Sequence, residues 1–237
     1  MQIEDYYEFS DGKLRFTRSQ GSQFAKHVAE DFNPLHDADA SRFCVPGDLL
    51  FSVILARYGI SAHMECTFAG MVTEGTELVL PEPAESLSIV DAQEREYLRI
   101  ERSGENTLCA ETIQNLSRQY VQFSGHSFPD LLVPLLAEHE VMINPQRPMV
   151  MYQSMSIDLD RVDIREPALC SDTSELSIDG KRGMAVLAFK LLDGDEPVGS
   201  GQKRILLSGL RPYDDEQMAG VVAVYEKRKE VFSGQNG

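Results

Sequence analysis

The chain has 237 residues, of which 42% are hydrophobic and 25% charged, a composition typical of a soluble globular protein. The formal net charge of −16 disfavours nucleic acid as a partner, because such a surface repels phosphate backbones. No apolar run approaches the roughly 20 residues that a membrane span requires, and the N-terminus is acidic where a signal peptide would be basic. We therefore expect a cytoplasmic protein with no membrane partner.

The cysteines are spread along the chain and give no support to a metal site. Cys44, Cys66, Cys109 and Cys170 form no C-x-x-C pair and have no close histidine, whereas zinc sites use closely spaced ligands of these types. We expect neither a metal nor a cofactor.

In chain order, the first predicted elements are a hairpin or opening strand and a short helix. Residues 6–17 alternate loosely in polarity, and Ser19 or Ser22 could cap a helix with Phe24 and Val28 on its apolar face. We expect this helix to lead directly into a loop over residues 30–37.

The next helix is apolar on nearly all sides. It covers residues 48–59, with Gly47 at its start and Gly59 at its end. Such a helix must be buried, and the residues after it offer a sheet to wrap around it. The predicted strands are residues 63–72, 77–80, 85–90, 94–102 and 107–116.

The same order of elements then repeats. Residues 128–142 predict a second apolar helix, and residues 214–232 predict a terminal helix with an apolar stripe. The strands predicted between them are residues 149–159, 168–177, 184–192 and 201–207. We therefore predict an α+β protein in three parts, which are residues 1–120, residues 121–213 and a C-terminal helix and tail over residues 214–237.

The loop over residues 30–37 concentrates groups that could carry chemistry. Asp31, Asn33 and His36 lie close together, and Pro34 fixes the backbone between them. A rigid loop of this kind could hold a carboxylate and an imidazole around one water molecule, as general acid–base chemistry requires. The same residues are also a common turn signal, since Asp and Asn hydrogen-bond to their own backbone.

A glycine-rich segment at residues 199–203 resembles a fragment of a phosphate-binding loop. It lacks the full Gly-x-x-x-x-Gly-Lys-Ser/Thr spacing and lies between predicted strands. We therefore give Lys203 no role in phosphate binding.

Three pieces of the first half together resemble the MaoC-type hot dog domain of the R-specific enoyl-CoA hydratases. That group carries Asp-x-Asn-Pro-Leu-His, then a loop, then His-Gly at the head of a central helix. Residues 31–36 match the first piece, Gly47 matches the helix-head glycine, and residues 68–78 are similar to the strands that follow. Ser52 falls where the family often has a small hydroxyl residue. The resemblance covers about residues 16–116, and the second half is similar to a hot dog repeat only in layout.

The resemblance implies a double hot dog fold, in which two antiparallel sheets each wrap a central helix and form a pseudo-dimer. It places the chain in a bacterial branch of the group and implies a lyase that hydrates a trans-2-enoyl thioester of coenzyme A or acyl carrier protein. Asp31 and His36 would be catalytic, and Gly47, Asn33 and Ser52 would bind the substrate or its oxyanion. The chain would be a monomeric pseudo-dimer or a homodimer.

The sequence departs from the group at three positions. Glu30 replaces the glycine before the aspartate, and Pro46 replaces the histidine before Gly47. Asp48 puts a carboxylate at the helix head, where it would oppose a developing oxyanion. These departures favour an alternative, a non-catalytic hot dog module that binds acyl thioesters or lipids. Acyl thioesterase is a third possibility, because hot dog domains also support that reaction.

Coenzyme A would also need positive charge on an otherwise acidic surface. Lys13, Arg15 and Arg18 are close in sequence and could form a basic patch for its phosphates.

Overall fold

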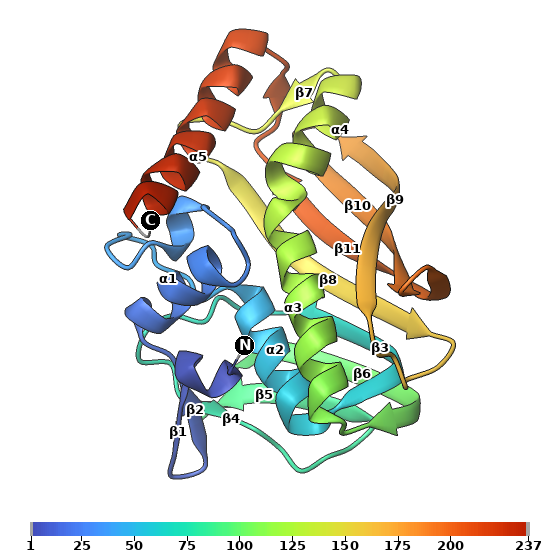
Figure 1. Ribbon diagram of the computed structural model, residues 1–237. Helices are drawn as coiled ribbons and strands as arrows, with labels where there is room; N and C mark the ends of the chain where they lie inside the picture. The colour runs from blue at the N-terminus through green and yellow to red at the C-terminus, as the bar shows by residue number, and fades with distance from the viewer. Residues whose placement is uncertain (1, 236–237) are drawn as a thin grey trace.

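A ten-stranded antiparallel sheet dominates the computed structural model, which describes residues 2–235 (Figure 1). In the order in which they lie side by side, the strands are β1 (Glu8–Ser10), β2 (Lys13–Arg15), β4 (Leu78–Val79), β5 (Ser86–Asp91), β6 (Glu96–Thr107), β3 (Ile60–Phe68), β8 (Met149–Leu159), β11 (Glu196–Ser208), β10 (Arg182–Asp193) and β9 (Pro167–Asp179). A separate two-stranded sheet pairs β12 (Arg211–Pro212) with β7 (Val141–Met142).

The helices connect and cover these strands. They are η1 (Ile3–Tyr6), α1 (Arg18–His27), η2 (Pro34–His36), α2 (Gly47–Tyr58), α3 (Ala110–Ser127), η3 (Phe128–Leu132), α4 (Val133–Glu138) and α5 (Asp215–Gln235). No helix within the described residues is both long enough and apolar enough to cross a membrane.

The two halves of the large sheet meet at β3 and β8. These strands pair antiparallel from His63 opposite Asp158 to Thr67 opposite Ser154. The strands before this junction come from the first half of the chain and those after it from the second half. The pairing therefore makes one continuous sheet out of two sequence-separate halves.

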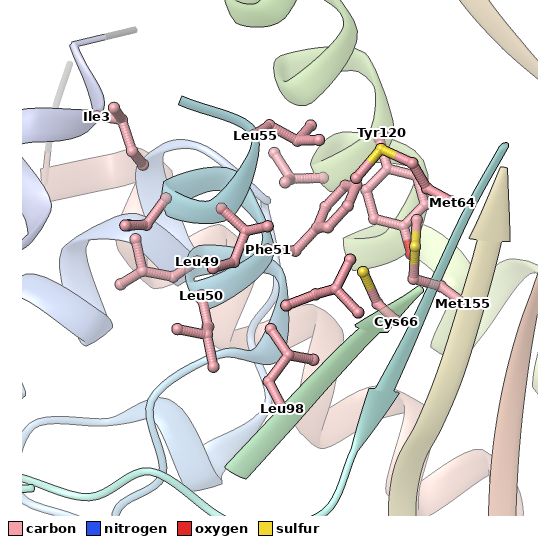
Figure 2. Packing of buried hydrophobic residues seen from close by; sticks show 14 of the residues in the cluster. Ile3, Leu49, Leu50, Phe51, Leu55, Met64, Cys66, Leu98, Tyr120 and Met155 are labelled. Carbon is pink, nitrogen blue, oxygen red and sulfur yellow. The ribbon is translucent and has the colours of Figure 1, made fainter. Parts of the chain in front are cut away.

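Helix α2 is the centre of the main core, as its composition predicts. Figure 2 shows Leu49, Phe51 and Leu55 of this helix among side chains from the sheet, including Cys66 and Leu98. The helix ends where Gly59 takes a φ of 83°, a conformation that an added Cβ would strain.

Helix α3 runs through the middle of the chain, packs against α2 and crosses in front of the sheet (Figure 1). With one central helix for each half of a continuous antiparallel sheet, and α5 added at the end, the predicted α+β double hot dog fold is confirmed.

The second central helix begins earlier in the chain than predicted. Residues 107–116 were expected as a strand, but α3 begins at Ala110. Of the helix expected over residues 128–142, η3 and α4 are helical and Val141–Met142 is strand β7. Ile113, Leu116 and Tyr120 are buried at spacings of three and four residues, which fit a helix and not a strand. This helical spacing was present in the sequence, and the strand prediction overlooked it.

Two smaller expectations also need comment. Thr17, rather than Ser19 or Ser22, caps α1, and its side chain forms a capping box with Gln20. The expected boundary at residue 120 lies inside α3, which is continuous there. A division of the chain into two repeats therefore stays a prediction, and residues 1, 236 and 237 of its outer parts lie outside the described residues.

Candidate functional site

The loop after α1 is a rigid turn built by its own polar side chains. Asp31 donates its N–H to the carbonyl of Ala25 at 2.8 Å, and its Oδ1 accepts the N–H of Asn33 at 2.9 Å. Oδ1 of Asn33 accepts the N–H of Leu35 at 3.1 Å, which caps η2. These contacts use the backbone-bonding tendency of Asp and Asn, and they leave Oδ2 of Asp31 available.

Asp31 and His36 face each other across this turn. Oδ2 of Asp31 lies 3.6 Å from Nε2 of His36, and the two side chains are 24% and 12% exposed. Nδ1 of His36 lies 2.7 Å from the carbonyl oxygen of Cys44, which can only accept a hydrogen bond, so we assign the proton to Nδ1. In this tautomer of the imidazole, Nε2 is an acceptor and lies beside the carboxylate.

The same contacts bring the pair to the head of α2. Cys44 binds His36 through its carbonyl and donates its N–H to the carbonyl of Leu35 at 3.0 Å. Three residues later α2 begins at Gly47. Leu49 and Leu50 donate to the carbonyl of Pro46, which leaves the N–H groups of Gly47 and Asp48 as first-turn donors for a ligand.

A side chain at Gly47 would crowd two aromatic rings. A Cβ added there would lie 3.1 Å from the ring of Phe68 and 3.1 Å from the ring of Tyr152. The two rings pack on each other with centroids 4.4 Å apart. The aromatic pair therefore forms an apolar wall beside the helix head.

Ser52 and Asn33 are engaged within the protein. Ser52 donates its hydroxyl to the carbonyl of Asp48 at 2.8 Å and accepts the hydroxyl of Ser117 at 2.9 Å. These hydrogen bonds join α2 to α3. The Asn33 side chain bonds within its own turn, to the N–H of Leu35. Both side chains hold the shape of the site.

A buried polar cluster lies behind the helix head. Ser124 of α3 donates its hydroxyl to Oδ2 of Asp48 at 2.5 Å, and Lys203 of β11 donates to the Ser124 hydroxyl. The Lys203 ammonium also lies 4.4 Å from the ring centroid of Tyr152, whose hydroxyl is hydrogen-bonded to that of Tyr120. Asp48 and Lys203 are each 8% exposed.

Burial dominates the titration of this cluster. It raises the pKa of Asp48, against the opposing effects of the Lys203 charge and the Ser124 hydrogen bond. It also raises the pKa of Tyr120 and of Tyr152 well above the usual value for a phenol. The two tyrosines are therefore neutral hydrogen-bonding groups at neutral pH.

Ser124, Tyr152 and Lys203 were missed by sequence reasoning. Lys203 lies in the segment that resembles a phosphate-loop fragment, but it is buried in β11 in the same alternation as Ile205 and Leu207. The sequence does place Lys203 at the same alternating positions as the core residues of this strand. That placement indicates a buried lysine, and a buried cation needs hydrogen-bonding partners.

The structure shows what Glu30 and Pro46 do at the two positions where they depart from the MaoC-type motif. Glu30 takes a φ of 54°, the left-handed conformation that favours glycine, and its Oε2 lies 2.9 Å from Nε2 of His126. Pro46 is the N-cap of α2 and offers no side-chain cap.

The terminal helix fastens the site loop from outside. The hydroxyl of Tyr225 accepts the N–H of Phe32 at 3.2 Å. Asp37 is bound by Arg228 of α5 and by Lys26 of α1, the latter at 2.8 Å. Although burial acts to raise it, hydrogen bonds from Lys26 and Arg228 lower the pKa of Asp37. Helices α1 and α5 thus both bind this loop.

The expected basic patch is already neutralised. Lys13 and Arg15 both pair with Glu77, and Arg18 pairs with Glu74. Within residues 2–235 no group of three His, Cys, Asp or Glu side chains is arranged to hold a metal ion.

Two surface hollows lie away from Asp31 and His36. One, on the sheet, is lined by Glu65, Glu101 and Asp158 among others, and the second by Glu74, Glu77 and Asp91 among others. Both linings are acidic and unsuited to a phosphate group.

Comparison with known proteins gives a family and remote structural neighbours. Residues 1–216 match the profile of a family described as "Protein of unknown function (DUF3581)". No curated protein matches the chain.

Among solved structures, the acyl-CoA thioesterase II TesB2 from Mycobacterium marinum is 13% identical, with 90% of this chain and 99% of the other covered and a TM-score of 0.43. A conserved protein with a hot dog fold from Alicyclobacillus acidocaldarius is 6% identical, with coverage of 90% and 99% and a TM-score of 0.46. A MaoC-like dehydratase is 10% identical, with coverage of 86% and 98% and a TM-score of 0.41. Similarity at this level does not extend to activity.

Proposed function

The chain belongs to the DUF3581 family, and we propose that it is a hydratase, a lyase that adds water to a trans-2-enoyl thioester. The observation that carries this proposal is the pair formed by Asp31 and His36, 3.6 Å apart at the head of a buried helix. The match of residues 31–36 to the MaoC-type motif supports the same reaction. The substrate class is an acyl chain on coenzyme A or on acyl carrier protein.

The pair is arranged to hold one water molecule. Oδ2 of Asp31 and the unprotonated Nε2 of His36 are both acceptors, so a water between them donates both of its hydrogens. Its oxygen lone pair is then free to attack. The backbone contacts of both residues fix this geometry before substrate binds, which removes reorganisation from the chemical step.

Each atom of the water has a destination in the reaction. The oxygen forms a bond to the β-carbon as the double bond opens, and one proton passes to the Asp31–His36 pair. The electron pair of the double bond moves toward the thioester oxygen, and the α-carbon then receives a proton from the pair. The second proton stays on the new hydroxyl group, so the pair is regenerated.

Negative charge on the thioester oxygen needs a donor. The N–H of Gly47 lies at the start of α2, where the helix dipole also favours negative charge. We assign Gly47 to the oxyanion, and we assign Asn33 and Ser52 to positioning, because their side chains bind the protein itself.

The test is the loss of enoyl absorbance when purified protein is added to trans-2-enoyl thioesters of short and medium chain length, on coenzyme A and on acyl carrier protein. Asp31→Asn should lower kcat/KM by about 10²–10⁴-fold, the usual contribution of a general acid–base group. Asp39→Asn, an exposed change nearby in the chain, is the matched control and should leave the rate unchanged.

Three results would count against hydration by the Asp31–His36 pair. Full activity of Asp31→Asn would remove that residue from the mechanism. Release of the free thiol without hydration would identify a thioesterase. Thermal stabilisation by acyl thioesters without turnover would identify the non-catalytic binding module.

A further inference from the structure

The buried carboxyl of Asp48 has one oxygen with no partner. Its Oδ2 accepts the hydroxyl of Ser124 at 2.5 Å, but its Oδ1 is buried and has no hydrogen-bond partner among residues 2–235. Leaving a buried polar atom unpaired is unfavourable, and more so when the group is charged. A ligand atom that bonds to Oδ1 would satisfy this oxygen.

The direction of the neighbouring hydrogen bonds shows what Oδ1 can offer. A lysine ammonium only donates, so Lys203 uses a lone pair of the Ser124 hydroxyl. The Ser124 hydrogen must then point to Oδ2 of Asp48, which acts as an acceptor. If the carboxyl is protonated, its proton therefore sits on Oδ1 and is directed away from the cluster.

The surroundings of Asp48 favour that protonated form. Asp48 is only 8% exposed, and Lys203 reaches it only through the neutral hydroxyl of Ser124. Among the described residues its carboxyl therefore accepts one hydrogen bond from a neutral group and forms no direct ion pair, which is a poor environment for a buried negative charge.

We propose that Asp48 is a catalytic residue that, as a neutral carboxylic acid, donates a hydrogen bond from Oδ1 to the thioester oxygen beside the N–H of Gly47. Ser124 and Lys203 are positioning residues that fix which oxygen carries the proton. This assignment rests on the proposed hydration. As a carboxylate, Asp48 would oppose the oxyanion, whereas as a neutral acid it is a second hydrogen-bond donor to it.

The titration of Asp48 agrees with this assignment. Burial raises its pKa, and the nearby Asp31 charge acts in the same direction, while Lys203, Ser124 and His36 oppose it. Titratable groups acting on Asp48 or on its near neighbours come from five places in the fold, namely Asp31 and His36 in the loop, Cys66 of β3, Tyr120 of α3, Tyr152 of β8 and Lys203 of β11.

The protonation state can be measured without any substrate. Infrared difference spectra of wild type minus Asp48→Asn at neutral pH should contain the carbonyl stretch of one protonated carboxyl group. A difference that contains only carboxylate bands would overturn the inference, whether or not the protein is a hydratase. Absence of turnover in wild type would instead reject the proposed function and leave the infrared result to stand.

Turnover then tests the donor. Asp48→Asn keeps an N–H donor where Oδ1 was, so kcat/KM should fall by no more than about tenfold, whereas Asp48→Ala should lose about 10²–10³-fold. Wild-type activity should fall at alkaline pH as Asp48 ionises, and this limb should be missing in Asp48→Asn. Equal losses in the two variants would show that a carboxyl, and not a donor, is needed.

Lys203→Met tests whether Lys203 acts on the ionisation of Asp48 or only supports the fold. Removing the positive charge disfavours ionised Asp48, so the alkaline limb should move to higher pH. A lower rate with the limb unmoved would contradict the role given to Lys203.

Discussion

A glutamate at a glycine position is the clearest strain at the scale of single residues. Glu30 holds a φ of 54° directly before Asp31, and its partner His126 is half-exposed. An exposed pair of this kind contributes little, whereas the left-handed conformation costs a non-glycine residue about 1 kcal/mol. Backbone strain next to a proposed catalytic residue is common in active sites.

Glu30→Gly should therefore stabilise the fold by about 0.5–1 kcal/mol, because glycine adopts this φ without strain. Urea unfolding measures the change. Glu30→Ala is the control, since it also removes the His126 contact but keeps the strained conformation. A glycine variant no more stable than the alanine variant would show that the strain is absent.

The sequence predicted the site residues that lie within one short motif, and it missed those that lie far from that motif in the chain. Asp31 and His36 share one turn, so a short motif defines both. Ser124 and Lys203 are 79 residues apart in the chain and meet only when β11 lies beneath α3. The charge and hydrogen-bond state of Asp48 depends on that meeting, which no local pattern encodes.

At the scale of elements, α3 and the site loop fit together without space for a methyl group. A Cβ added at Gly125 would lie 1.8 Å from the carbonyl oxygen of Ala29, at the start of the loop. Gly220 on α5 has nothing within 4 Å of an added Cβ. The two helical glycines therefore make a matched pair.

Gly125→Ala should destabilise the protein by about 2–3 kcal/mol, because the loop must move. It should also lower the rate at which the protein hydrates an enoyl thioester. Gly220→Ala should stabilise by about 0.5–1 kcal/mol, since alanine favours a helix. Unfolding in urea measures both. An unchanged free energy of unfolding in Gly125→Ala would mean that the loop is not held against α3.

The contact of α5 with the loop should depend on pH. The folded pKa of Asp37 lies below its ordinary value of 3.8, so its contribution to stability is fully present above that pH. The contribution is lost as the pH falls through the lowered folded value.

The difference in unfolding free energy between wild type and Asp37→Asn should therefore be constant near neutrality and shrink below a pH of about 4. Urea unfolding across a pH series measures it. A difference that stays the same down to a pH of about 2 would exclude ionisation of Asp37 as its source.

At the scale of the whole molecule, the pairing of β3 with β8 decides where the site lies. It makes one sheet from two halves, so that α2 of the first half and α3, β8 and β11 of the second half surround the same cluster. The fold class followed from the order of apolar helices and strand-forming segments. The start of α3 did not, although the apolar residues Ile113, Leu116 and Tyr120 recur at helical spacing.

The measurement that bears most directly on the Asp31–His36 water is the position of a label from isotopically labelled water. Wild type acting on a trans-2-enoyl thioester should yield one enantiomer of the 3-hydroxyacyl thioester, the R form, with the label in its new hydroxyl group. Asp31→Asn should yield almost none. Label in a free carboxylate, or a racemic hydroxyl product, would contradict addition of a water held by this pair.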